Sequence, residues 1–270
     1  MGTGRVWQGG RRDDGGARGV EHRVFNVAEV AGYLHVSAAD VEELVRRDAI
    51  PHERLGGRVV FRRPAIDLWA SRRILGFPSA SLRTYHDRSS ARVSEDSGPH
   101  ALIPELLPVD RVEAALASRT KPSLIRDMVE RADRTGLLIF PVELREGIEA
   151  RERMGSTALS GGVAMLHAER HDPYLFEASF LVLARTVQPI PFGSPDGRTT
   201  DIFFLLCCRE EAIHLHALAR LCMICHHTDA LLRLREADGA AAMHAALVEN
   251  EAVVLDTLPA PTGGGKGTAP

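Results

Sequence analysis

The chain has 270 residues, of which 44% are hydrophobic and 26% charged, and its formal net charge at pH 7 is −3. This length suits one large or two ordinary globular domains, and the composition excludes a chain that is disordered throughout. The printed sequence has no apolar run near the roughly 18 residues that a membrane span requires, and its first residues carry glycine and charge where a signal peptide has an apolar core. We therefore expect a cytoplasmic protein with no membrane partner.

Composition divides the chain into segments. Residues 1–21 are rich in Gly and Arg and residues 258–270 in Pro, Gly and Thr, so we expect both ends to be disordered tails. Residues 76–101 are rich in Ser, Arg and Asp, which predicts a flexible linker. The linker would join a domain at 22–75 to a second domain at 102–251.

The domain at 22–75 is predicted to contain three short helices and a β-hairpin. Asn26 and Ser37 are good N-caps for the first two helices, and the second ends at Ile50-Pro51. The pair Gly56-Gly57 lies between alternating residues and predicts the hairpin, and Pro64 opens the last helix.

This pattern resembles the winged helix-turn-helix of excisionase and MerR-type regulators. The matching segments are FNVAEVAGYLHVSAADVEELVRRDAIP and LGGRVVFRRPAIDLWASRR. The resemblance implies that the second helix enters the major groove and that the wing contacts phosphate. The wing arginines that would bind DNA are Arg54, Arg58, Arg62 and Arg63. Because the second helix carries Asp40, Glu42 and Glu43 where a base-reading helix has other polar residues, a module that docks a protein is the alternative.

The domain at 102–251 has an α/β pattern. The segments Ser179–Val187 and Asp201–Cys208 are near-continuous apolar runs, which are typical of strands covered by helices on both faces. We therefore expect a mixed sheet with helices on both faces. Residues 102–270 carry a net charge of −6, which argues against nonspecific binding of phosphate backbones by this domain.

Two histidines of this domain are candidates for chemistry. The short run Val163–Leu166 delivers His167 to the end of a buried segment, where an imidazole can act as a nucleophile. His214 falls in the first turn of the helix IHLHALARL, and N–H groups at a helix start favour a nearby phosphate. His171 and His216 are expected at the rim or surface.

The second domain resembles the enzyme IIA domain of the mannitol, fructose and nitrogen class of the bacterial phosphotransferase system. The segments that carry the resemblance include RERMGST, GGVAMLH and QPIPFGSPDGRTTDIFFLL. It implies that His167 accepts a phosphoryl group from a histidine phosphocarrier protein and that His214 supports it. Arg151 would neutralise phosphoryl oxygens, and Thr157 would donate a hydrogen bond to them. The family's usual Ile-Pro-His-Gly is replaced by Met165-Leu166-His167-Ala168, so a IIA fold that only senses is an alternative.

The four cysteines all lie between Cys207 and Cys225, which does not resemble a secreted disulfide framework and predicts free thiols. The string Cys222–His226 fits a c-type haem attachment motif, and its cysteines and histidines could be read as zinc ligands. Because the string lies inside one amphipathic helix, we expect neither a metal nor a cofactor.

The functional hypothesis is a bacterial regulator in which phosphorylation of His167 modulates an N-terminal DNA-binding helix-turn-helix through added negative charge. One alternative is a phosphocarrier whose helix-turn-helix docks proteins. The other is an interaction protein that keeps the fold without being phosphorylated. Whether the chain is an enzyme stays open, because it would at most carry a phosphohistidine.

Overall fold

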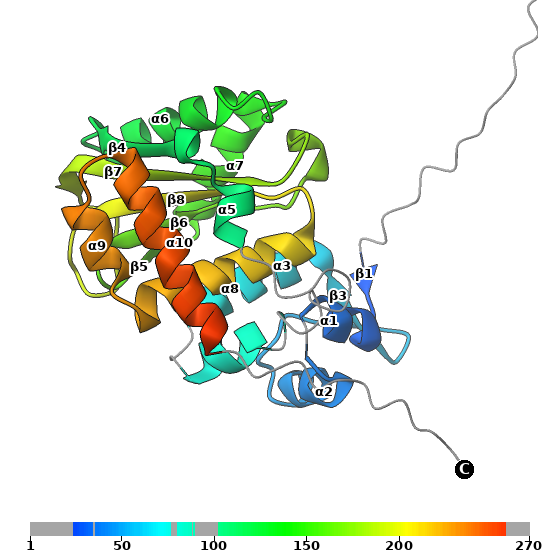
Figure 1. Ribbon diagram of the computed structural model, residues 1–270. Helices are drawn as coiled ribbons and strands as arrows, with labels where there is room; N and C mark the ends of the chain where they lie inside the picture. Colours follow the sequence, from blue (N-terminus) through cyan, green and yellow to red (C-terminus); the bar gives the residue numbers. More distant parts are fainter. Residues whose placement is uncertain (1–23, 35, 77–79, 88, 90–101, 258–270) are drawn as a thin grey trace, which may run out of the picture.

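The computed structural model describes residues 24–34, 36–76, 80–87, 89 and 102–257. The tails expected at 1–21 and 258–270 lie outside the described residues. Figure 1 shows a sheet between two groups of helices, with a smaller unit of helices and short strands beside it. Among the described residues, no helix combines the length and the apolar character needed to cross a membrane.

The smaller unit contains the three helices and the hairpin expected from the sequence. Asn26 and Ser37 each close a capping box, with Glu29 and Asp40 respectively, and so start the first two helices. Gly56 and Gly57 both have positive φ, +56° and +79°, as a tight two-residue hairpin turn requires. The elements are β1 (Val24–Phe25), α1 (Val27–Tyr33), α2 (Ala38–Arg46), β2 (Glu53–Leu55), β3 (Arg58–Arg62) and α3 (Arg63–Leu75). Their sheet has the order β1-β3-β2 and is antiparallel.

The larger unit is built on a five-stranded sheet of order β4-β7-β8-β6-β5. The pairs β4–β7 and β6–β8 are parallel, whereas β7–β8 and β5–β6 are antiparallel, so the sheet is mixed. The strands are β4 (Val112–Leu116), β5 (Ala158–Leu159), β6 (Val163–Leu166), β7 (Phe180–Ile190) and β8 (Thr200–Cys207). The helices are α5 (Leu102–Leu106), α6 (Lys121–Asp133), α7 (Pro141–Arg153), α8 (Glu211–His227), α9 (Ala230–Glu236) and α10 (Ala240–Asp256), with short 3₁₀ turns at Val109–Arg111 and Pro173–Leu175.

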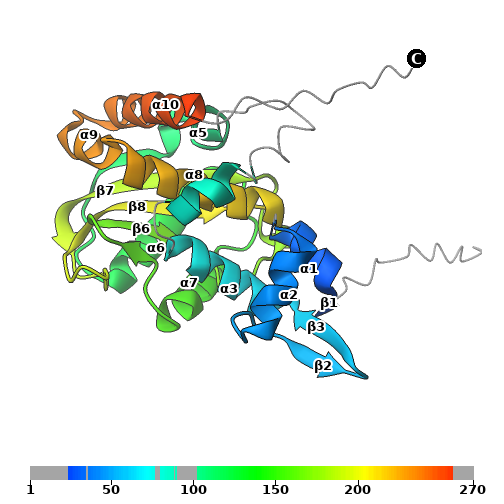
Figure 2. The same cartoon turned by 90° about the horizontal axis from the view of Figure 1, so that it is seen from below.

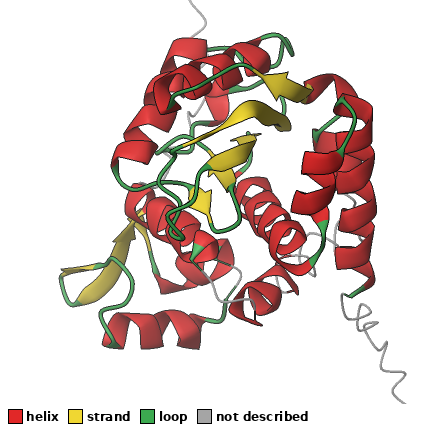
Figure 3. Cartoon of the chain, turned by 90° about the vertical axis from the view of Figure 1, so that its left-hand side faces the viewer, coloured by secondary structure: helices red, strands yellow, loops and turns green. Residues whose placement is uncertain are grey.

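Helices cover both faces of this sheet, as Figure 3 shows from the side. Phe180 and Val182 of β7 belong to the core under α6 and α7, whereas Leu181 and Leu183 belong to the core that includes α8. Because successive strand residues point to opposite faces, a strand buried on both sides reads as a continuous apolar run. The expected mixed α/β fold is confirmed.

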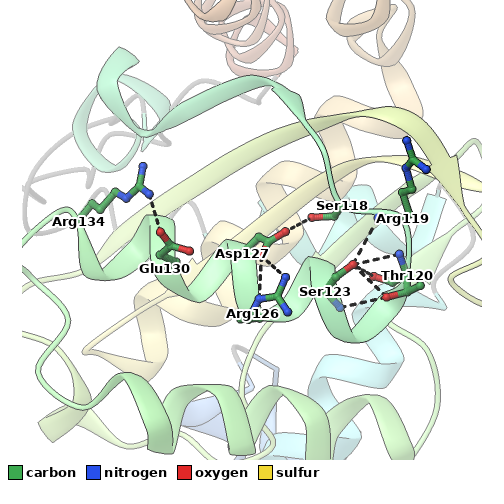
Figure 4. A network of polar contacts seen from close by, with 8 residues as sticks. All are labelled: Ser118, Arg119, Thr120, Ser123, Arg126, Asp127, Glu130 and Arg134. Atoms are coloured by element: carbon green, nitrogen blue, oxygen red, sulfur yellow. Dashed lines mark hydrogen bonds and ion pairs between the residues drawn. The ribbon is translucent and has the colours of Figure 1, made fainter.

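The start of α6 is held by the side-chain hydrogen bonds that Figure 4 shows. Thr120 and Ser123 form a capping box, and the Ser118 hydroxyl donates to Asp127 Oδ2 at 2.5 Å. These contacts determine where α6 begins and therefore where Lys121 lies, one residue after the cap.

The segment after α3 differs from the flexible linker expected at 76–101. Residues 80–87 and 89 are helical, and Leu82, Tyr85 and His86 are buried. Arg220 of α8 donates to His86 Nε2 at 2.5 Å, and the Ser89 hydroxyl lies 2.9 Å from His216 Nδ1. Short, mostly polar segments carry little periodicity of their own, and here the helix obtains its partners from α8. His216, expected at the surface, is therefore buried as well.

The smaller unit packs directly on the larger one. Helix α3 lies against α8, as both Figure 1 and Figure 2 show. Buried residues of the two units, Ile66 and Ala70 of α3 and Leu215 and Leu218 of α8 among them, belong to one continuous apolar cluster. This contact brings residues of the smaller unit close to the end of β6.

Candidate functional site

His167 follows the last residue of β6 and is held by hydrogen bonds at both ring nitrogens. Its Nδ1 lies 2.9 Å from the Met165 carbonyl oxygen, and Arg151 Nε lies 3.2 Å from its Nε2. A carbonyl only accepts and a guanidinium only donates, so the proton is on Nδ1 and the lone pair is on Nε2. The structure therefore places a potential nucleophile, Nε2 of His167, beside the Arg151 guanidinium.

The ring of His167 is neutral near pH 7. Burial lowers the pKa of His167 well below its usual value of 6.5, and the nearby His214 and Arg151 lower it further. A neutral imidazole keeps its Nε2 lone pair available for attack on an electrophile such as phosphorus.

Two of the other expected residues converge on this ring. His214, on α8, has its ring centroid 5.1 Å from that of His167, and burial lowers its pKa to about 3. Arg151, from the last turn of α7, is only 2% exposed and also donates from its Nη1 to the Gly155 carbonyl at 2.8 Å. Two histidines and an arginine from three different elements thus surround one point.

Thr157 does not take the position expected for it. Its hydroxyl donates to Glu152 Oε1, and its backbone N–H donates to the same oxygen at 3.0 Å. The other Glu152 oxygen pairs with Lys121 Nζ at 2.8 Å. The hydroxyl proton of Thr157 is therefore used within the domain and is not directed at His167, because the neighbouring buried carboxylate is the stronger acceptor.

A small cavity of about 30 Å³ adjoins His167, Arg151 and His214. It is also lined by residues that the sequence did not single out, Tyr33, Asp67, Leu68 and Ser71 of the smaller unit. Asp67 is largely buried, which raises its pKa to about 6, and the Tyr33 hydroxyl is its hydrogen-bond partner. Nothing in the sequence pattern pairs these residues with His167, since more than eighty residues separate them and only the packing of α3 on α8 joins them.

The four wing arginines have different surroundings. Arg54 and Arg58 are exposed near the tip of the hairpin. Arg62 donates twice to Glu53, at 2.6 and 3.1 Å, and the Arg63 guanidinium lies 5.9 Å from the centre of the Phe25 ring. Hence Arg54 and Arg58 are the two most available for an outside anion.

The four cysteines are free and buried. Burial raises the pKa of Cys208 and of Cys225 to about 12, so these thiols stay protonated. Within the described residues, no group of three or more potential metal ligands comes together.

Comparison with known proteins gives matches to both units. Residues 105–250 match the family model described as "Phosphoenolpyruvate-dependent sugar phosphotransferase system, EIIA 2", and residues 24–74 match a helix-turn-helix domain model. A nitrogen regulatory protein of Bradyrhizobium diazoefficiens is 34% identical over 151 residues, which make up 55% of this chain and 90% of that protein. A nitrogen regulatory protein of Pseudomonas aeruginosa is 28% identical over 106 residues, or 38% of this chain and 67% of that protein.

Among solved structures, the nitrogen regulatory protein IIA-Ntr of Neisseria meningitidis aligns with a TM-score of 0.49 and 25% identity. The alignment covers 54% of this chain and 99% of that one.

Proposed function

Because the chain belongs to the EIIA 2 family of the phosphoenolpyruvate-dependent sugar phosphotransferase system and carries a helix-turn-helix domain at 24–74, we propose that His167 accepts a phosphoryl group and thereby modulates the helix-turn-helix. The observation that carries this proposal is the geometry at His167 Nε2, a neutral nitrogen with its lone pair beside the Arg151 guanidinium. The proposed donor is a histidine phosphocarrier protein, which implies a cytoplasmic location.

The proposed transfer needs no further reactant. Nε2 of His167 attacks the phosphorus of the donor's phosphoimidazole, which is protonated on its other ring nitrogen. A new N–P bond forms, and the donor's N–P bond breaks with its electron pair returning to the donor ring, which leaves as neutral imidazole. The proton on Nδ1 stays in its hydrogen bond to the Met165 carbonyl. Arg151 turns its donors from Nε2 to the phosphoryl oxygens, and His214 approaches them from the other side. The protein thus mainly positions groups and stabilises charge.

The test is incubation with phosphoenolpyruvate, enzyme I and the phosphocarrier protein, followed by detection of acid-labile phosphate. Wild type is expected to be labelled and His167→Ala is not. His244→Ala, which removes a histidine of α10 outside the cavity, is the matched control and should keep its label. Equal labelling of the wild type and His167→Ala would remove His167 from the mechanism.

The helix-turn-helix part of the proposal is DNA binding through the wing. The two exposed arginines, Arg54 and Arg58, are the groups that support it. Changing both to Ala should weaken a mobility shift and reduce the salt slope by about 2, since each phosphate contact contributes about 0.9. The control is Arg126→Ala with Arg134→Ala, which makes the same charge change on α6 and at the residue that follows it. The absence of a shift with any chromosomal fragment at low salt would exclude this part.

Protein docking is the second candidate for the helix-turn-helix. An apolar groove of about 360 Å³ lies between α2, α3 and the helix at 80–87, with Leu44 and Trp69 in its lining and Asp40 and Glu43 among its polar residues. On α2, Glu43 also pairs with both Arg46 and Arg47. An acidic helix beside an apolar groove favours a protein partner over a phosphate backbone, and it would be the preferred explanation if DNA binding is absent.

A further inference from the structure

The helix-turn-helix unit covers the residue to which it is proposed to respond. We propose that docking of α1 and α3 closes access to His167, that phosphoryl transfer requires this contact to open, and that a phosphoryl group on His167 then keeps it open. The inference rests on the proposed function of His167 and names its regulation. The test below separates the two.

Access to the nucleophile is blocked from the side of the cavity. His167 is 3% exposed, and the cavity beside it, at about 30 Å³, holds about two water molecules. In-line transfer requires the reacting atoms to approach to about 3–3.5 Å, with the donor's ring behind the phosphorus. Tyr33, Asp67, Leu68 and Ser71 form part of the wall of this cavity and leave no room for a donor beside the ring. A donor therefore reaches Nε2 only after α1 and α3 have moved away.

The contact that closes the site has a part beside the cavity and an apolar part. Leu68 and Ser71 of α3 line the cavity. Beside them, Arg72 donates from Nη2 to the Met154 carbonyl just after α7, a polar bond that joins the two units. The rest of the contact is apolar, through Ile66 and Ala70 of α3 against α8. Opening exposes this apolar surface to water, so the open state is the minor one.

Opening does not release the unit altogether. The helix at 80–87 and Ser89 bind α8 through the hydrogen bonds of His86 and His216. The segment that follows α3 in the chain therefore stays attached to the larger unit. An anchored unit has a high effective concentration at its docking surface and closes again without a partner. The arrangement can therefore switch repeatedly.

Charge makes the docked and phosphorylated states incompatible. Asp67 lines the cavity with His167, and its Oδ1 has no hydrogen-bond partner in the part of the chain that the structure describes. A phosphoryl group brings up to about two negative charges and three acceptor oxygens into this space. The carboxylate of Asp67 would then face a like charge at short range, and the cavity lacks the volume for both. Phosphorylation of His167 thus weakens docking, and binding linkage then requires that docking weakens phosphorylation.

The experiment uses the full chain and opens the contact by substitution. Leu68→Glu places a charge in the docked surface, and Arg72→Ala removes the bond to Met154 while leaving the buried face of α3 unchanged. Leu55→Glu is the matched control, because it makes the same change at an exposed position on the hairpin. Two quantities are measured, the reaction of His167 with diethyl pyrocarbonate by mass spectrometry without any donor, and the initial rate of phosphoryl labelling.

Both opening variants should react at His167 and accept label at least about tenfold faster than the wild type, because a minor open state holds about 10% of molecules or fewer. Leu55→Glu should match the wild type in both measurements. Equal diethyl pyrocarbonate reactivity of His167 in the wild type and both variants would overturn the gating, whatever the labelling shows. Faster diethyl pyrocarbonate reaction without label in any protein would instead overturn the proposed function and leave the closed contact standing. Slower labelling of the variants would show that the docked unit completes the site and would also overturn the gating.

Discussion

At the scale of single residues, the arrangement around His167 depends on Arg151. This arginine is buried, its pKa is lowered by that burial, and one of its donors is used to hold His167 Nε2 in the unprotonated form. The aliphatic part of the side chain fills space inside the domain, so a useful substitution removes the donors and keeps the volume.

We predict that Arg151→Met lowers the labelling rate of His167 by about 10²–10³, the range found when one donor to a developing anion is removed. The labelling rate of Arg151→Lys should lie between those of the wild type and Arg151→Met, since a lysine keeps the charge without the planar set of donors. Arg153→Met, at an exposed position two residues further along α7, is the control and should label normally. Labelling of Arg151→Met at the wild-type rate would contradict this role.

A second residue-scale prediction concerns the buried pair Arg220–Glu251. Glu251 accepts from Arg220 at 2.8 Å and from the backbone N–H groups of Leu102 and Ile103 at 2.8 and 2.9 Å. Glu251→Ala leaves a buried guanidinium without its counter-charge and should lower the free energy of unfolding by about 3–5 kcal/mol. Glu249→Ala, on the same helix as Glu251, breaks the exposed pair with Arg233 of α9 and should lower the free energy of unfolding far less. Urea unfolding of both variants measures the difference, and similar small losses would refute it.

At the scale of elements, α7 and the segment after β6 have to approach closely. The backbone N–H of Glu169 donates to the Gly147 carbonyl at 2.9 Å, and a Cβ added at Gly147 would lie 3.0 Å from the Cβ of Ala168. Gly147 is thus the residue that lets α7 hold the chain directly after His167. Its conformational cost within a helix is offset by this approach.

Gly147→Ala is predicted to destabilise the protein by about 1–3 kcal/mol through overpacking and to slow labelling of His167 by displacing Ala168. Gly32→Ala, in α1, meets nothing within 4 Å and should stabilise the protein by up to about 1 kcal/mol through helix propensity. Thermal unfolding of the two variants should therefore shift in opposite directions. A rise in melting temperature for both variants would contradict the prediction, because it would mean that the segment after His167 moves to accommodate the added methyl group at no cost in stability.

At the scale of the whole molecule, Asp67 couples the contact between the two units to pH. Its pKa is raised from 3.8 to about 6 by burial, so the folded state holds the proton more tightly than the unfolded state does. Stability due to this group is therefore present below about pH 4 and is lost as pH rises toward 6. The shift corresponds to at most about 3 kcal/mol, and partial exposure of the side chain reduces that to about 1–2 kcal/mol.

Asp67→Asn cannot ionise and keeps an acceptor for the Tyr33 hydroxyl. We expect it to match the wild type near pH 4 and to be more stable by about 1–2 kcal/mol at pH 7, measured by urea unfolding at both values. The buried histidines His86, His167 and His214 have lowered pKa values, so both proteins lose stability as pH falls below about 6.5, and this loss cancels in the difference. A difference that does not change with pH would contradict the assignment.

Much of the fold was predictable because its signals are local. The capping boxes at Asn26 and Ser37 and the paired glycines of the hairpin lie within three or four residues of the groups they satisfy. The continuous apolar run of β7 likewise reports burial on both faces. The resemblance to IIA domains added His167, Arg151 and His214, which the structure brings together.

Other features could not be found in this way. Thr157 was expected to donate a hydrogen bond to the phosphoryl group. Its hydroxyl instead donates to Glu152, which lies at the end of α7. The helix at 80–87 looked like a linker because its partners His216 and Arg220 are on α8, more than a hundred residues away in the chain. Isolated polar residues with distant partners leave no periodic signal in a single sequence.

The sequence by itself determined the two units, their elements and the identity of the histidine at the end of β6, because capping, turn chemistry and apolar periodicity act over a few residues. Only the tertiary structure decided that Tyr33 and Asp67 of the first unit lie over His167 of the second. That contact results from packing α3 on α8, and the free energy of such a contact depends on how two finished surfaces fit. Neither surface exists until each unit has folded.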